Sequence, residues 1–287
     1  MTKVTVDDGV EIHYYLDDYT NPWDEECETI LMHHGSGENS KFYIPIAHAL
    51  ARRYRVLRFD ARGRGESSAP PEGSTFSGEA TDDSPIAAGE RCVKDVLSLM
   101  DHLGIDKVHW FGVSSGGVIG IPFAVQHPNR LKSLILCTTP YTFPRGYLAS
   151  LSYGERDPAT AIEKLGNSEF WRRGGLFSMV LDSSKTEKKM LEWELAQRQK
   201  IPTHIYSAFW KWVQSFDYAE WLPKIKTPTL ILAAEHSKIQ DPEMQQFMQR
   251  QIPNSKLVVF EGVGHSIHML MPERCAEAVV NFVQSIA

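Results

Sequence analysis

The sequence predicts an α/β protein whose parallel sheet is covered by helices on both faces. Short apolar segments of strand length alternate with segments of helical spacing in the first half of the chain, and this alternation resumes after about residue 222. Such alternation is typical of βαβ units, which bury parallel strands on both faces. Residues 141–221 show helical patterns only. We therefore expect one core, formed by residues 1–140 and 222–287, with residues 141–221 inserted as a helical cap or lid.

The expected elements follow in chain order. The apolar and alternating segments predict strands at 4–6, 10–15, 29–32, 54–59, 107–111, 131–137, 229–234 and 256–260. Helical spacing predicts core helices at 44–51, 93–103, 116–127, 243–251 and 272–286. The segment Ser67–Gly89 is rich in Ser, Pro, Gly and acidic residues and has no period, so it is expected to be a long loop. Two roles stay open for this loop, an edge of the pocket or a plain insertion.

Composition excludes several classes of protein. The 287 residues include 30 Lys plus Arg and 36 Asp plus Glu, a formal net charge of −6. This acidic balance disfavours a nucleic acid or an anionic membrane as partner, because phosphates attract basic surfaces. The 4 cysteines are far apart and have no metal-ligand spacing, so neither a zinc site nor a disulfide framework is expected, which favours a cytoplasmic protein. No apolar stretch has the length of a membrane helix.

The strongest local signal is a G-x-S-x-G pattern that runs from Gly112 to Gly116 and has Ser114 at its centre. It follows a predicted strand and opens a predicted helix, which is the context that a nucleophile elbow requires. A nucleotide-binding turn is the alternative, but it would need G-x-G-x-x-G and an acid near the end of the next strand, and both are missing. Ser114 is therefore the candidate nucleophile.

A serine hydroxyl needs a base to take its proton. His265 is the candidate base because it follows the last predicted strand, where a loop can face the elbow. His236 also follows a strand and is the rival candidate, whereas His268 is expected to have a packing role. The amides of Ser36, in the turn after the strand at 29–32, and of Ser115, at the start of a helix, are candidates for an oxyanion hole.

These motifs together resemble the α/β-hydrolase superfamily over nearly the whole chain. The resemblance includes the turn at His34 and Gly35, the segment from Asp60 to Ser67, the Ser114 elbow, and the Gly264-His265 pair. It implies an eight-stranded, mostly parallel sheet with a helical cap after strand six. Within the superfamily the chain looks most like cap-bearing esterases, lactonases and carbon–carbon bond hydrolases. The resemblance also implies that Asp60 and Arg62 brace a turn.

One position departs from the family pattern. An aspartate is expected after strand seven to orient the histidine, and alignment on Glu235 and on Pro242 places Ser237 there. Three substitutes stay open: the longer side chain of Glu235, Asp241 in the same loop, or the Ser237 hydroxyl itself. Asp241 precedes a proline at a helix start, a pattern typical of an N-cap. A carboxylate from the cap is a further alternative.

The sequence therefore predicts a serine hydrolase that cleaves a carboxylic ester or lactone of a small hydrophobic substrate through an acyl-enzyme. No cofactor or metal is expected. Five of the 7 tryptophans lie between residues 141 and 222, and the aromatic lid is the reason to expect a hydrophobic substrate. Two alternatives keep the same fold: a carbon–carbon bond hydrolase of a β-diketone-type substrate, and a non-catalytic ligand receptor.

Overall fold

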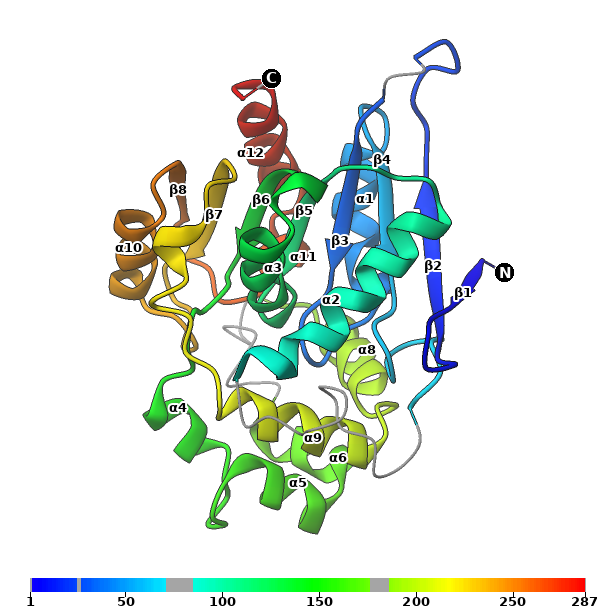
Figure 1. Cartoon of the computed structure of the whole chain (residues 1–287). Helices are drawn as coiled ribbons and strands as arrows, with labels where there is room; N and C mark the ends of the chain where they lie inside the picture. Colours follow the sequence, from blue (N-terminus) through cyan, green and yellow to red (C-terminus); the bar gives the residue numbers. More distant parts are fainter. Residues whose placement is uncertain (1, 25–26, 71–84, 176–185, 287) are drawn as a thin grey trace.

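The computed structural model describes residues 2–24, 27–70, 85–175 and 186–286. Eight strands form one sheet in the order β1-β2-β4-β3-β5-β6-β7-β8 (Figure 1). The β1–β2 and β2–β4 pairs are antiparallel, and the pairs from β4 across to β8 are parallel. The eight-stranded, mostly parallel sheet expected from the sequence is confirmed.

The strands are β1 (Lys3–Thr5), β2 (Glu11–Asp17), β3 (Thr29–His33), β4 (Arg55–Phe59), β5 (Val108–Val113), β6 (Leu131–Cys137), β7 (Thr229–Ala234) and β8 (Ser255–Phe260). The helices around the sheet are α1 (Ile44–Leu50), α2 (Pro85–His102), α3 (Ser115–Gln126), α10 (Pro242–Gln251), α11 (Ile267–Leu270) and α12 (Pro272–Gln284). Between β6 and β7 lie α4 (Arg145–Ser150), α5 (Pro158–Leu165), α6 (Asn167–Phe170), α8 (Lys188–Arg198) and α9 (Thr203–Val213). Short helical turns are η1 (Ser40–Tyr43), η2 (Pro128–Arg130), η3 (Trp171–Gly175) and η4 (Leu222–Lys224).

Side-chain alternation along the buried strands divides the core into two layers. In β5, Trp110 packs with residues of α2 and α3, whereas its neighbour Phe111 packs with residues of α1 and α12. Successive side chains of a strand point to opposite faces, so these helix pairs cover opposite faces of the sheet (Figure 1). Strands buried on both faces need apolar residues at every position, and β3 and β5 are buried throughout.

The helices inserted between β6 and β7 gather at one end of the sheet (Figure 1). Their interior is aromatic. Four fully buried side chains contact one another there: Phe170, Trp171, Tyr206 and Trp210. These side chains give the short helices a core of their own, because each aromatic ring buries a large apolar area. Trp171 and Trp210 therefore stabilise the inserted helices.

One predicted boundary is wrong. The segment Ser67–Gly89 was expected to be a loop throughout, but α2 begins at Pro85. Proline is tolerated in the first turn of a helix because the amide that it lacks would have no helical partner there. Residues 71–84 lie outside the described residues, and so does the role expected for this loop.

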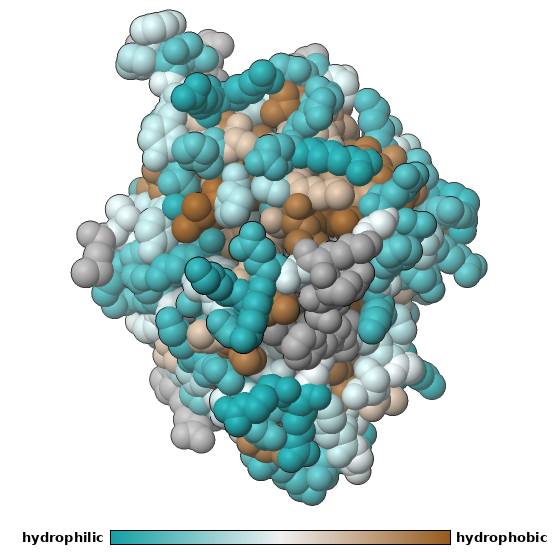
Figure 2. All heavy atoms as spheres, turned by 180° about the vertical axis from the view of Figure 1, so that it is seen from behind, coloured by the Kyte–Doolittle hydropathy of each residue, from teal (hydrophilic) through white to brown (hydrophobic). Residues whose placement is uncertain are grey.

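The surface seen from behind is mainly hydrophilic, with apolar side chains exposed between the polar ones (Figure 2). Among the described residues, no helix combines the length and the apolar character needed to cross a bilayer. Within the same residues, no three His, Cys, Asp or Glu side chains converge in a way that could hold a metal ion.

Candidate active site

Ser114 lies between β5 and α3 in a strained backbone conformation, with φ of 50° and ψ of −117°. A non-glycine residue in this region costs roughly 1–3 kcal/mol and is found where the surrounding structure enforces it. The enforcement is steric: a Cβ on Gly112 would collide with the backbone of Gly117, and one on Gly116 would collide with the carbonyl of His33. Glycine at these two positions lets the strand, the turn and the helix approach closely enough to place Ser114 at the tip of the bend.

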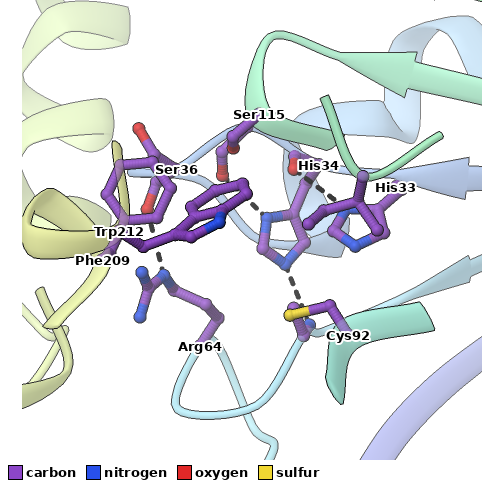
Figure 3. Close-up of a pocket in the computed structure, with 11 residues that line it drawn as sticks. His33, His34, Ser36, Arg64, Cys92, Ser115, Phe209 and Trp212 are labelled. Atoms are coloured by element: carbon purple, nitrogen blue, oxygen red, sulfur yellow. Dashed lines mark hydrogen bonds between the residues drawn. The ribbon is translucent and has the colours of Figure 1, made fainter. Parts of the chain in front are cut away.

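The turn after β3 is held beside this bend by His34. Its Nδ1 donates to the carbonyl oxygen of Gly35 at 2.8 Å, and its Nε2 accepts from the Ala61 amide at 2.9 Å (Figure 3). Burial lowers the pKa of His34 to about 3, so the ring is neutral and can make both bonds. Because the C=O and N–H of a trans peptide point in opposite directions, fixing the Gly35 carbonyl also fixes the Ser36 amide.

Arg64 braces the same turn from the other side. Its Nε donates to the carbonyl oxygen of Ser36 at 3.0 Å (Figure 3). The guanidinium is 3% exposed, and burial lowers its pKa to about 10. A buried cation beside the Ser36 turn adds positive potential where an oxyanion would form. Sequence reasoning did not single out Arg64 for this position.

His265 follows β8 and lines a small cavity together with Ser114. The cavity measures about 10 Å³, which is close to the space that one water molecule requires, and its wall also includes Ser36, Glu38 and Arg198. Neither Ser114 Oγ nor His265 Nε2 has a hydrogen-bond partner among the described residues. The structure thus brings the candidate nucleophile and base to one cavity without a direct hydrogen bond between them.

The other ring nitrogen of His265 contacts Ser237. The distance from His265 Nδ1 to Ser237 Oγ is 3.2 Å, and Ser237 Oγ also accepts from the Ile239 amide at 3.4 Å. With the hydrogen on Nδ1, the imidazole donates to Ser237 and leaves Nε2 unprotonated toward the cavity. This is the tautomer that a general base needs.

The two alternative acids of this loop have other partners. Glu235 Oε2 accepts from the Gly262 amide at 2.7 Å. Asp241 Oδ1 accepts from the Met244 amide at 2.7 Å and is the N-cap of α10, as its position before Pro242 predicted. Neither carboxylate is hydrogen-bonded to His265, so the Ser237 hydroxyl is the group on Nδ1.

The electrostatic surroundings of His265 are unusual for a base. The ring is 4% exposed, and its pKa is lowered to about 3 by burial, by His268 and by Arg198. A lowered pKa means that the imidazolium is poorly stabilised, because no carboxylate on Nδ1 offsets the new charge. The structure therefore holds a neutral imidazole whose protonated form needs a counter-charge.

Other expected residues have structural roles. His236 is 64% exposed at its side chain and lies beside Glu235, away from the cavity lining, so it no longer rivals His265. Asp60 accepts from the amides of Ser40 and Glu66. Arg62 donates to Asp95 and to Asp8. These bonds tie the turn after β4 to its surroundings, as the resemblance implied.

A second cavity also adjoins the turn that contains Gly35 and Ser36. It measures about 20 Å³, and its wall includes Ser115, Ile119, Phe209 and Trp212 (Figure 3). Phe209 and Trp212 come from α9, so the inserted helices form part of the wall. Gly35 and Ser36 line both cavities. Ser114 lines the first cavity only, whereas Ile119, Phe209 and Trp212 line the second only.

Sequence reasoning missed two charged residues of the first cavity. Glu38 is 5% exposed and Arg198 is 2% exposed, and their closest oxygen and nitrogen atoms are 3.8 Å apart. Arg198 also pairs with Glu194 at 2.9 Å. Glu38 stands three residues after Gly35, and this position in the oxyanion turn was the available signal. Arg198 has no comparable local signal, because it reaches the site from an inserted helix.

A family model described as the alpha/beta hydrolase fold matches residues 28–272. The chain belongs to this family. The superfamily resemblance noted in the sequence is therefore confirmed.

Similar proteins carry several different activities in their names. A putative carbamate hydrolase RutD from a Caulobacter species is 26% identical over 268 residues, covering 91% of this chain and 92% of that protein. A proline iminopeptidase from Lactobacillus helveticus is 28% identical over 280 residues, covering 90% of this chain and 88% of that protein. The solved structure of the enol-lactonase from Burkholderia xenovorans superposes with a TM-score of 0.83 at 22% identity, covering 99% and 100% of the two chains. At such identity the superposition establishes the fold alone.

Proposed function

We propose that this chain is a serine hydrolase that cleaves a carboxylic ester or lactone through an acyl-enzyme on Ser114. The observation that carries the proposal is the shared cavity, in which a strained, glycine-flanked serine and a neutral histidine nitrogen both lack other partners among the described residues. Hydrolases among the family's named relatives support the same reaction class.

In the proposed mechanism, Ser114 Oγ attacks the substrate carbonyl carbon while its proton passes to His265 Nε2. The carbonyl electron pair becomes an oxyanion, which accepts from the amides of Ser36 and Ser115; removal of one such donor costs about 3 kcal/mol in related enzymes. His265 then protonates the leaving alcohol, and a water activated by the same nitrogen releases the acyl group. The His34 and Arg64 bonds to the turn hold the Ser36 amide in place.

The second cavity supports a hydrophobic substrate. Its wall of Ile119, Phe209 and Trp212 adjoins the oxyanion turn, where the alcohol or acyl part of an ester could extend from the carbonyl. Apolar walls with a few polar groups are typical of small-molecule sites.

We further propose that residues 141–221 act as a lid. The inserted helices contribute Arg198 to one cavity and Phe209 and Trp212 to the other. Cavities of about 10 and 20 Å³ hold one or two waters at most. An ester is larger than either cavity, so in this proposal the inserted helices move away from the core to admit it.

Reaction of the purified protein with a fluorophosphonate tests the nucleophile without a known substrate. We expect one covalent adduct per chain on Ser114, detected by intact mass and peptide mapping, and no adduct in Ser114→Ala. Hydrolysis of p-nitrophenyl butyrate should disappear in the same variant. Silence of the parent protein toward the fluorophosphonate would favour the receptor, and full activity of Ser114→Ala would refute the assignment.

Product analysis distinguishes the bond that is cleaved. Hydrolysis of an ester yields an acid and an alcohol, whereas cleavage of a β-diketone yields an acid and a ketone. Faster turnover of the β-diketone than of matched esters would replace the proposed ester reaction with the carbon–carbon one.

A further inference from the structure

The proposed mechanism places a positive charge on His265, and the loop after β7 supplies no carboxylate to offset it. Ser237 presents only a hydroxyl to Nδ1, Glu235 binds the Gly262 amide, and Asp241 caps α10. Arg198 and His268 oppose the imidazolium further. A hydrolase with this arrangement needs a counter-charge from another direction.

Glu38 is a carboxylate in the lining of the cavity that contains Ser114 and His265. Among the described residues that line this cavity, no other is acidic. Glu38, Ser114 and His265 all line this one cavity, whose volume of about 10 Å³ is close to the space of one water. Away from bulk solvent, a carboxylate that faces the same cavity interacts more strongly with a developing positive charge than it would in water.

The position of Glu38 is fixed by its neighbours. Its Oε2 accepts from the Gly35 amide at 3.0 Å and lies 3.7 Å from His268 Nε2. Its Oε1 lies 3.8 Å from Arg198. Rigid placement by the oxyanion turn keeps the carboxylate at the cavity wall, with no entropy cost when the imidazolium forms.

Arg198 does not neutralise the charge of Glu38. The Arg198 guanidinium has a closer partner in Glu194, at 2.9 Å, which is buried on the same helix. The Arg198–Glu194 pair is formally neutral, so the charge of ionised Glu38 remains to act on the cavity. The other titratable groups facing Glu38 are His268 from α11, His265 itself, and Tyr43 from η1.

We infer that Glu38 is a positioning residue that replaces the missing triad acid, stabilising the His265 imidazolium from the cavity side of the ring. This inference rests on the proposed hydrolase function. When Ser114 Oγ bonds to the substrate carbon and its proton moves to Nε2, ionised Glu38 forms and breaks no bond. It lowers the energy of the imidazolium, while the Ser36 and Ser115 amides stabilise the oxyanion.

The ionisation of Glu38 gives the inference a pH signature. Burial raises the pKa of Glu38 above its ordinary value, against the opposing effects of Arg198 and the Gly35 amide. The active form carries ionised Glu38, so the rate falls as pH drops through this raised pKa. The pKa of His265, about 3, lies too low to produce that acidic limb.

The rate of fluorophosphonate labelling, measured against pH, tests the inference in Glu38→Gln. Glutamine keeps an oxygen for the Gly35 amide but removes the charge. We expect labelling to slow by ~100-fold at neutral pH and the acidic limb to disappear. Restoring a carboxylate with Ser237→Asp should make Glu38 dispensable, so that Glu38→Gln costs less than ~5-fold in that background.

Glu194→Gln is the matched control, because Glu194 is equally buried against Arg198 but does not line the cavity. We expect it to keep the acidic limb but to move it to lower pH, because Arg198 without Glu194 lowers the pKa of Glu38 further. An unchanged pH profile in Glu38→Gln, or equal losses in both backgrounds, would overturn the role of Glu38 while labelling of the parent still supports the hydrolase. Absence of labelling in the folded parent would overturn the hydrolase proposal itself.

Discussion

The loops after β7 and after β3 differ in where each places its acidic side chains. The loop after β7 contains Glu235 and Asp241, and both carboxylates bind backbone amides instead of His265. The loop after β3 contains Glu38, which lines the Ser114 cavity. His265 thus has a hydroxyl on Nδ1 and shares its cavity with a carboxylate from another loop. Under the proposed mechanism, the contrast teaches that the required charge comes from a different strand end of the same sheet.

The largest expected effect on the labelling rate comes from removing the imidazole of His265. His265→Ala should slow fluorophosphonate labelling by at least ~10⁴-fold, because the serine then lacks a base. His236→Ala is the matched control, since this histidine is 64% exposed in the loop after β7. Rates of labelling followed by mass spectrometry check both variants. A large loss in His236→Ala with a small one in His265→Ala would reverse the assignment.

A smaller effect, below that expected for Glu38→Gln, should come from restoring the acid that the family pattern places after β7. Ser237→Asp is expected to raise the pKa of His265, because a carboxylate on Nδ1 favours the imidazolium. We expect labelling to accelerate by ~10-fold or more at neutral pH. NMR titration of the His265 ring measures the pKa, and the labelling rate measures the effect on reactivity. A raised pKa without faster labelling would mean that the serine–histidine pair already has a sufficient counter-charge.

The smallest effect is expected at Asp241, the acid of the β7 loop that caps a helix. Asp241→Ala removes the bond to the Met244 amide and should lower the free energy of unfolding by about 1 kcal/mol. The labelling rate should stay within ~2-fold of the parent. Urea unfolding gives the first quantity and fluorophosphonate kinetics the second. A slower labelling rate with an unchanged free energy of unfolding would instead assign Asp241 a role in the reaction.

Residue patterns along the chain were sufficient to predict the sheet and the elbow. All eight strands of the structure match segments expected from the sequence. Central strands such as β3 and β5 are recognisable because strands buried on both faces must be apolar at nearly every position. Ser114 was found in the same way, since a tight bend between strand and helix demands glycines at fixed spacing. The N-cap role of Asp241 was also predictable, because it depends on neighbours within three residues.

Only the tertiary structure decided which charges share the cavity with Ser114. Glu38 and Arg198 are 160 positions apart in the sequence. They approach because an inserted helix lies against the turn after β3. Likewise, the partner of Glu235 is the Gly262 amide, which is 27 residues away and is brought to it by the fold. Electrostatic contacts have no period along the chain, so local spacing cannot reveal them. Hydrophobic periodicity and the steric demands of turns are local, so they were sufficient to predict the strands and the Ser114 elbow.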